Sequence, residues 1–485
     1  MLLKVCVTLL CGFLFASASA TEYECPYKAC YCEGNTIMCT DMGLNSTPKI
    51  INNYTPQITT LYLDLNQITT IPSGSIPANL TEIILDDNPI ITISNDAFVE
   101  SADTLQTLSF SGALFTDIPR ALTPLRVLKY FGLYNSKVRN WDEEVMKSIG
   151  ANLESLTLQN AGVISSLSWI RYFPNLMELI IEGCSISYLP DNVLDKLTDR
   201  LVTVSFASNS LNEIPRDFSK LTNIQKLDLG NNKISNITWL PRSKLKALVL
   251  NNNRIKDATP LSNVLRSAAD SLETLTLQVN QLEFIPELEF LNNLLKLDLT
   301  YNRISDPHSG SMPANMFALD LGNNHLPYIP WAMSNLTRLQ DLTMISNFVR
   351  DIEASNFPQG VIWVHLGYNI ITELNVADFP PNSTIQYLHL NNNPIGHIST
   401  NAFENLPNVN LINLAGTHIT RLPLALATVN SLIVFDATDC AGLVCTCQEK
   451  RLASLFIPLM PGDIHGDCGV TSIYDFFANF SSGCP

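Results

Sequence analysis

Residues 245–255 read LKALVLNNNRI, and this stretch decides the fold. We number its positions from Leu245, so that leucines stand at positions 1, 4 and 6, an asparagine at 9 and an isoleucine at 11. Side chains alternate along a strand, so positions 4 and 6 point into a core and positions 3, 5 and 7 point to the opposite face. The asparagine follows the strand, where its amide can satisfy backbone groups of neighbouring coils that would otherwise be buried unpaired.

The same frame recurs from Ile58 to Cys440, seventeen times in all. A single coil cannot bury its apolar side, so the coils must stack on one another. The pattern L-x-x-L-x-L-x-x-N/C-x-L resembles that of leucine-rich repeat proteins. We therefore expect an α/β fold, namely a leucine-rich repeat solenoid of about 17 coils with a parallel sheet on its concave side.

The convex side should consist of loops, 3₁₀ turns and short helices. Its segments often read I-x-x-I-P, and proline at that point excludes ladder pairing. Two longer convex segments have a helical pattern, Asp142–Ile149 and Leu261–Ala269.

The first 20 residues have the pattern of a secretory signal peptide. Lys4 precedes the apolar run Val5–Phe15, and the small residues Ala18, Ser19 and Ala20 offer a cleavage site. A membrane helix is the alternative, but the run is too short for it. The chain ends without a hydrophobic tail for a lipid anchor. We expect a secreted, extracellular protein without a membrane span.

Two groups of cysteines flank the repeats. The expected domains are therefore an N-terminal cysteine cap over residues 21–57, the repeats over 58–440 and a C-terminal cysteine cap over 441–485. In a secreted chain such groups indicate disulfides, and zinc binding is the alternative for the first group. The eight cap cysteines are Cys25, Cys30, Cys32, Cys39, Cys445, Cys447, Cys468 and Cys484.

Position 9 is an asparagine in most coils but not in all of them. Repeats three to six carry Ala113, Ser136, Ala161 and Cys184 there, and the last repeat carries Cys440. One interpretation is that the turns of repeats three to six are less well tied, so that the solenoid can bend there. The other is compensation by water or by convex helices. Because Cys184 and Cys440 lie eleven repeats apart, we expect them to be buried free thiols.

Sequence patterns also restrict the partners and the chemistry. The net charge of −16 argues against binding of nucleic acid, heparin-like polymers or anionic membranes. No G-x-S-x-G, H-E-x-x-H or phosphate-loop motif occurs, so we expect no enzyme activity, no cofactor and no metal site. A protein-binding module is the favoured function, because a concave sheet is a ready-made surface. A structural role in the extracellular matrix or in innate recognition is the alternative.

The four-cysteine cap, the coils and the CxC…C…C tail together resemble extracellular leucine-rich repeat proteins of animals. The segments CPYKACYC and SLETLTLQVNQL are similar to a secreted arthropod branch. That branch includes relatives of the non-catalytic subunit of oplophorus-luciferin 2-monooxygenase. The resemblance implies an accessory, non-enzymatic partner of a secreted protein. It also implies that the caps pair Cys25 with Cys32, Cys30 with Cys39, Cys445 with Cys468, and Cys447 with Cys484.

Seven N-x-S/T triplets predict N-linked glycosylation. In the repeat frame none of them falls on a concave strand position, so sugars should coat the edges, the convex side and the ends. The seven asparagines are Asn45, Asn53, Asn79, Asn236, Asn335, Asn382 and Asn479.

The concave positions are rich in acids, which favours a partner with a basic surface, although surface acids also serve solubility. Aromatic residues and histidines gather there in repeats thirteen to fifteen. Exposed Trp and Tyr favour interfaces, whereas ordinary packing across the sheet is the alternative interpretation. The predicted binding residues are Asp298, Tyr301, Asp320, Asp341, Trp363, His365, Tyr368, Tyr387 and His389.

Overall fold

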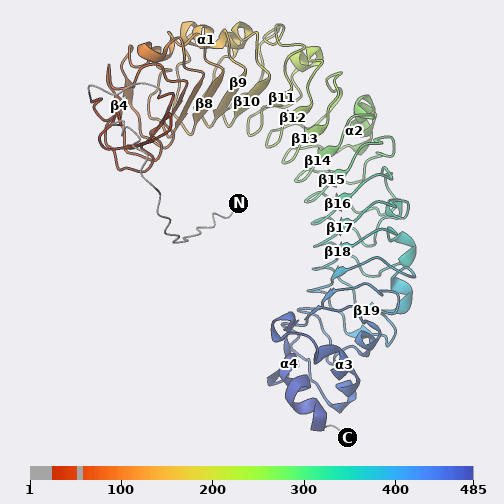
Figure 1. Ribbon diagram of the computed structural model, residues 1–485. Coiled ribbons are helices and arrows are strands. Elements are labelled where there is room, and N and C mark those ends of the chain that lie inside the picture. The colour runs from red at the N-terminus through yellow and green to blue at the C-terminus, as the bar shows by residue number, and fades with distance from the viewer. Residues whose placement is uncertain (1–24, 52–57, 484–485) are drawn as a thin grey trace.

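The chain forms an open arc whose concave side is lined by one continuous sheet (Figure 1). The computed structural model describes residues 25–51 and 58–483. The expected signal peptide, Asn53 and Cys484 therefore lie outside the described residues. None of the helices within the described part is long and apolar enough to cross a membrane.

Each of the seventeen repeats contributes one strand to this sheet, and neighbouring strands pair parallel and in register. The chain is thus a leucine-rich repeat solenoid, as the periodicity predicts. The strands are β3 Thr60–Tyr62, β5 Glu82–Ile84, β7 Thr107–Ser111, β8 Tyr130–Tyr134, β9 Ser155–Gln159, β10 Glu178–Glu182, β11 Thr203–Ser205, β12 Lys226–Asp228, β13 Ala247–Val249, β14 Thr274–Thr276, β15 Lys296–Asp298, β16 Ala318–Asp320, β17 Asp341–Thr343, β18 Trp363–His365, β20 Tyr387–His389, β22 Leu411–Asn413 and β23 Val434–Asp436.

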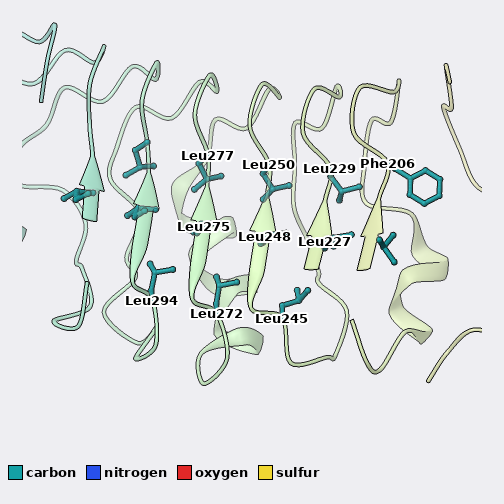
Figure 2. Packing of buried hydrophobic residues seen from close by; sticks show 14 of the residues in the cluster. Phe206, Leu227, Leu229, Leu245, Leu248, Leu250, Leu272, Leu275, Leu277 and Leu294 are labelled. Atoms are coloured by element: carbon teal, nitrogen blue, oxygen red, sulfur yellow. The ribbon is translucent and has the colours of Figure 1, made fainter. Parts of the chain in front are cut away.

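Positions 1, 4 and 6 of successive coils stack into continuous rows of buried leucines (Figure 2). Leu245, Leu248 and Leu250 each have no exposed surface. Neighbouring coils bury their apolar side chains against these rows, so each coil depends on the next for its core.

The convex side carries the two predicted helices. The first begins and ends one residue later than predicted, and the second begins three residues earlier and ends four residues earlier. Helix α1 spans Glu143–Gly150, and the carboxylate of Asp142 accepts from the backbone N–H groups of Glu144 and Val145. Helix α2 spans Ala258–Leu265, because Pro260 is tolerated in the first turn of a helix. The convex 3₁₀ turns are Val99–Ser101, Arg120–Leu122, Ser168–Tyr172, Arg216–Lys220, Arg266–Ala268, Trp331–Met333, Ala354–Asn356, Val376–Asp378 and Leu424–Thr428.

Short parallel strand pairs also form on the convex side of the coils. The prolines there predict that no such pairing occurs, and this prediction is wrong. Strand β4 (Thr70–Ile71) pairs with β6 (Thr92–Ile93), and β19 (Glu373–Leu374) pairs with β21 (His397–Ile398). The pairs are two residues long, and β4 ends directly before Pro72. Proline thus limits the length of these strands rather than preventing them.

The buried asparagines at position 9 form a row along the solenoid, and we call them the ladder asparagines. They join neighbouring coils. The Nδ2 of Asn253 donates to the carbonyls of Leu250 in its own coil and Leu229 in the previous coil, at 3.1 and 2.9 Å. Its Oδ1 accepts from the N–H of Ile234 at 2.9 Å. One buried side chain therefore satisfies backbone groups on two coils. The same arrangement recurs at Asn280, Asn302, Asn324, Asn347, Asn369 and Asn393.

The structure favours compensation over looser turns in repeats three to six, and bending of the solenoid at these repeats stays a prediction. Strands β7 to β10 are the longest of the sheet, with five residues each. Compensation comes from the backbone itself. The N–H of Val138 donates to the carbonyl of Ala161 at 3.2 Å, and the N–H of Ile164 donates to that of Cys184 at 3.2 Å. In repeats five and six, position 9 thus offers its main-chain oxygen where most other coils offer a side-chain oxygen.

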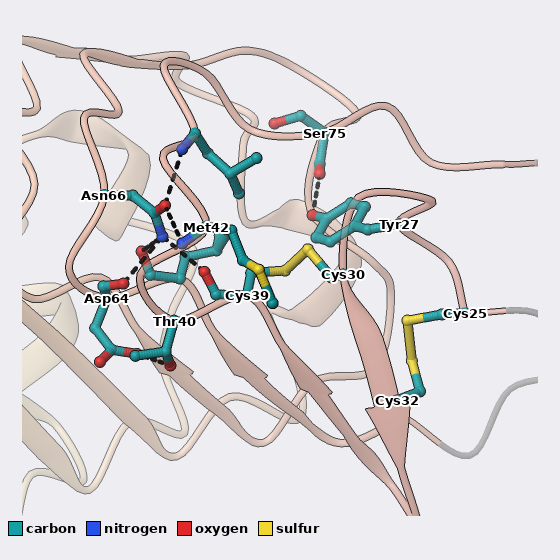
Figure 3. The surroundings of a disulfide bond; sticks show 12 residues. Cys25, Tyr27, Cys30, Cys32, Cys39, Thr40, Met42, Asp64, Asn66 and Ser75 are labelled. Carbon is teal, nitrogen blue, oxygen red and sulfur yellow. Dashed lines mark hydrogen bonds between the residues drawn. A yellow bond between two sulfur atoms is a disulfide. The ribbon is translucent and has the colours of Figure 1, made fainter.

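The N-terminal cap extends the sheet, and Figure 3 shows its two disulfides together with Asn66 of the first coil. Strand β1 (Tyr31–Glu33) pairs antiparallel with β2 (Thr36–Met38), and β2 pairs parallel with β3. The disulfides Cys25–Cys32 and Cys30–Cys39 are those that the resemblance implies. The first ladder asparagine, Asn66, donates to the carbonyl of Cys39 at 2.7 Å and so ties the cap to the repeats.

At the other end, β24 (Ile464–His465) pairs with β23 and closes the sheet. Cys445 is bonded to Cys468, again as the resemblance implies. Cys447 is also disulfide-bonded, while its expected partner Cys484 lies outside the described residues. The other elements of this cap are the 3₁₀ turns Cys447–Leu452, Pro461–Asp463 and Ser481–Gly483, helices α3 Ala453–Phe456 and α4 Ile473–Asp475, the π-turn Phe476–Phe480, and the antiparallel pair β25 Asp467–Cys468 and β26 Thr471–Ser472.

The two cysteines at position 9, Cys184 and Cys440, are free and buried, as expected. The Sγ of Cys184 lies 3.3 Å from the carbonyl oxygen of Glu182, and the Sγ of Cys440 lies 3.3 Å from that of Leu414. Each thiol therefore occupies the place of a ladder amide. Burial raises the pKa of Cys184 to about 11, which keeps its thiol protonated at neutral pH.

Candidate binding face

Four of the predicted residues form two stacked pairs on the concave side of β18 and β20. The parallel register places Trp363 opposite Tyr387 and His365 opposite His389. The Trp363 and Tyr387 rings are stacked with centroids 5.6 Å apart, and the two imidazoles are stacked at 4.6 Å. Trp363 is 36% exposed, so its ring is partly open to solvent. We call these four residues the aromatic–histidine patch.

Three carboxylates lie on the strands that precede this patch. The register places Asp298 of β15 opposite Asp320 of β16, and Asp341 of β17 opposite Trp363. Asp320 accepts from the N–H of Gly322 at 2.9 Å. Burial, together with repulsion from Asp298 and Asp341, nevertheless raises the pKa of Asp320 to about 6. The charges of these three carboxylates therefore interact, although each comes from a different coil.

The two histidines are more easily deprotonated than a free imidazole. Burial lowers the pKa of His365, and burial together with the neighbouring His365 lowers the pKa of His389. Asp341 acts on His365 in the opposite direction, but its effect is smaller. Both rings are therefore predominantly neutral at pH 7.

Tyr301 and Tyr368 are exposed, at 58% and 55%, but they lie beyond the paired strands. Both occupy position 8 with left-handed φ angles of +53° and +56°, which carry the chain out of the sheet. Their side chains therefore belong to the edge of the solenoid, beside the ladder. The role of these two tyrosines in binding stays a prediction.

The sequence interpretation did not identify a hollow in front of the carboxylates. Its volume is about 300 Å³, and Lys296, Asp298, Ala318, Asp320 and Asp341 are among the residues that line it. The hollow exists because Ala318 places only a methyl group between the longer side chains of Lys296 and Asp341 in the adjacent coils. A small residue at position 3 between two charged ones is a signal that the sequence does contain.

The described sequon asparagines all have exposed side chains, and none lies on a concave strand. This holds for Asn45, Asn79, Asn236, Asn335, Asn382 and Asn479. Glycosylation of these residues would leave the candidate face bare and remains a prediction.

Comparison with known proteins agrees with the fold. Profiles described as "Leucine rich repeat" and "Leucine Rich repeats (2 copies)" match residues 359–425 and 199–242. Human podocan-like protein 1 is 25% identical over 73% of this chain and 69% of its own length. Bovine osteomodulin is 27% identical over 49% of this chain and 63% of its own length. The chain is thus a leucine-rich repeat protein with similarity to secreted proteins of that class.

Other matches cover smaller parts of the relatives or show the fold alone. Bovine Toll-like receptor 10 is 25% identical over 36% of this chain, and the match spans only 22% of that receptor. Among solved structures, a leucine-rich repeat protein of Leptospira interrogans aligns with a TM-score of 0.61 at 22% identity. That alignment covers 85% of this chain and 96% of the other.

Proposed function

We propose that the protein is a secreted, non-enzymatic binding module whose concave face, over repeats eleven to fifteen, recognises an extracellular protein partner. The observation that carries this proposal is the pair of ring stacks on β18 and β20. A half-exposed indole on a flat, open sheet offers a large apolar area with a polar tip, as central residues of protein interfaces do.

Rigidity of the strands beneath the patch supports the same conclusion. The asparagine ladder is unbroken from Asn302 to Asn393, and every one of its members is buried. The strands also keep one register from β14 to β23. A surface that is already ordered loses less conformational entropy when it binds, so more of the contact energy appears as affinity.

The chemistry around the patch favours a partner with basic side chains. Asp298, Asp320 and Asp341 lie on the strands that precede it, and Asp436 follows two strands after it. The whole chain carries a net charge of −16, which would speed the approach of such a partner.

Within this function, the narrower resemblance of the caps and coils makes the accessory subunit of a secreted enzyme the first role to test. A matrix or innate-recognition protein is the second role, favoured by the similarity to podocan-like protein 1 and osteomodulin over large parts of their length.

Affinity capture from the extracellular fluid of the source, with the purified glycosylated chain as bait, separates these roles. A stoichiometric partner that the bait retains supports the binding module, and an enzyme activity in the captured fraction identifies the accessory role. Assembly of the pure chain into large particles would support the matrix role. Turnover of a substrate by the pure chain alone would overturn the proposal.

A further inference from the structure

Two hollows of opposite character adjoin at Lys296, which lines both of them. The first is the hollow of about 300 Å³ in front of the carboxylates, on the concave strands β14 to β17, and we call it the acidic hollow. The second, of about 480 Å³, opens along the edge where these strands begin, and we call it the edge hollow. Leu295, Phe317, Arg338 and Gln340 are among its lining residues.

The acidic hollow contains polar atoms without a partner. The Oδ1 of Asp341 and the Oγ1 of Thr276 are buried and make no hydrogen bond among the described residues. Both residues line the hollow. A buried carboxylate oxygen without a donor is costly, and a cationic donor that entered the hollow would remove that cost.

The edge hollow has a different chemistry. Leu295 and Phe317 are 40% and 41% exposed and lie side by side on adjacent coils, so they offer a joint apolar surface. Arg338 and Lys296 border them, and the described part of the chain shows no salt bridge for either cation. The hollow thus combines an apolar floor with two positive charges that lack a bound carboxylate.

Resting on the proposed function, we propose that the two hollows together receive one extended segment of the partner. A basic side chain enters the acidic hollow, and an apolar residue followed by an acidic one occupies the edge hollow. Positions 2 and 5 of a coil are three residues apart, or roughly 10 Å along a strand. An extended peptide spans that distance in about three residues, so the segment carries the basic and apolar residues at positions 1 and 4.

A short peptide tests this pairing directly. The probe is acetyl-Arg-Ala-Ala-Phe-Glu-amide, whose charges cancel, so that it is not drawn to the acidic chain as a whole. We expect saturable binding to the full chain by isothermal titration at pH 7.5. Replacement of the arginine by norleucine should weaken binding at least tenfold.

Variants of the chain locate the two contacts. Asp320→Asn and Asp341→Asn should each weaken binding of the probe at least tenfold. Arg338→Gln should weaken binding of the probe but not binding of the probe analogue in which glutamine replaces the glutamate. Asp228→Asn is the matched control, because Asp228 also stands at position 5 and accepts from the N–H of Gly230 at 2.9 Å, as Asp320 does from Gly322. The control should change affinity less than twofold. Equal melting temperatures exclude misfolding as the cause.

Three results would overturn this inference: no saturable binding of the probe, equal affinity for the norleucine peptide, or equal losses in Asp228→Asn and Asp320→Asn. A failure of the proposed function can be told apart from a failure of this inference. If a captured partner tolerates Asp320→Asn and Asp341→Asn but is lost with Trp363→Ala, the binding module stands without this segment. If the probe binds as expected but no partner depends on Trp363, the hollows form a site of their own.

Discussion

A ladder asparagine does more for the fold than any exposed residue near it. Asn302 donates to the carbonyls of Leu277 and Leu299, and it accepts from the N–H of Leu282. Asn302→Ala would leave these buried groups unpaired, at a cost of about 1–3 kcal/mol each. We expect the free energy of unfolding, measured with urea, to fall by at least about 3 kcal/mol. The exposed Asn292→Ala is the control, and equal losses in the two variants would contradict this role of the ladder.

The two ladder cysteines predict a simple labelling result. Because burial raises the pKa of Cys184 to about 11, its thiol stays protonated and shielded in the native protein. We consider the secreted chain after the expected removal of residues 1–20, which include Cys6 and Cys11. An alkylating reagent at pH 8 should therefore add no label to this chain in its native state and two labels after denaturation without reduction. Mass spectrometry counts the labels. A disulfide between Cys440 and a cysteine of the C-terminal cap would make the assignment wrong.

The sequence predicts the position of each strand, because the leucines of every coil mark it. It did not predict how coils five and six satisfy their turns, since main-chain pairing leaves no side-chain signal at position 9. One residue of the sequence nevertheless marks this compensation. Gly162 has a φ of +113°, and a Cβ there would lie 2.0 Å from the carbonyl oxygen of Val138. That glycine permits two coils to approach closely at the point where no asparagine joins them.

At the scale of this coil pair, Gly162→Ala should disrupt the close approach. Backbone strain and the steric clash together should cost about 3 kcal/mol or more. Gly396→Ala is the matched control, because a Cβ at Gly396 meets no atom within 4 Å. Thermal unfolding, monitored by circular dichroism, gives the melting temperatures of the two variants for comparison. A melting temperature of Gly162→Ala equal to that of the control would contradict the proposed compensation.

The stacked histidines of β18 and β20 predict a pH dependence of stability. Burial lowers the pKa of both, so the stability that the neutral rings contribute is complete above pH 6.5 and is lost as the pH falls below that value. Urea unfolding at pH 7.5 and 5.5 should show a larger loss for the wild type than for the variant His365→Gln/His389→Gln. The raised pKa of Asp320 acts in the opposite direction, but it is present in both proteins. Equal losses would show that the pair is not buried enough to matter.

At the scale of the whole molecule, the arc and its concave sheet follow from stacking one repeat, so both could be predicted. The candidate site could be predicted only in part. Trp363, Tyr387 and the two histidines meet because parallel strands keep their register. Tyr301 and Tyr368 lie beyond the paired strands, because the backbone turns into the left-handed region at position 8. The pattern of leucines does not reveal this turn. The hollows were missed because they depend on the volume that several coils leave open together.

The central claim is that the partner docks on the aromatic–histidine patch, and the affinity of the captured partner for three variants tests it most directly. Trp363→Ala and Tyr387→Ala remove neighbouring rings from the patch. Tyr130→Ala removes a ring that is 46% exposed at the same position 3 of repeat four. We expect Trp363→Ala to raise Kd at least about 30-fold, which corresponds to about 2 kcal/mol for a central anchor. Tyr387→Ala should weaken binding clearly, and Tyr130→Ala should leave Kd within about twofold. Unchanged Kd values for Trp363→Ala and Tyr387→Ala, with a loss in Tyr130→Ala, would contradict the account and place the binding face at the other end of the arc.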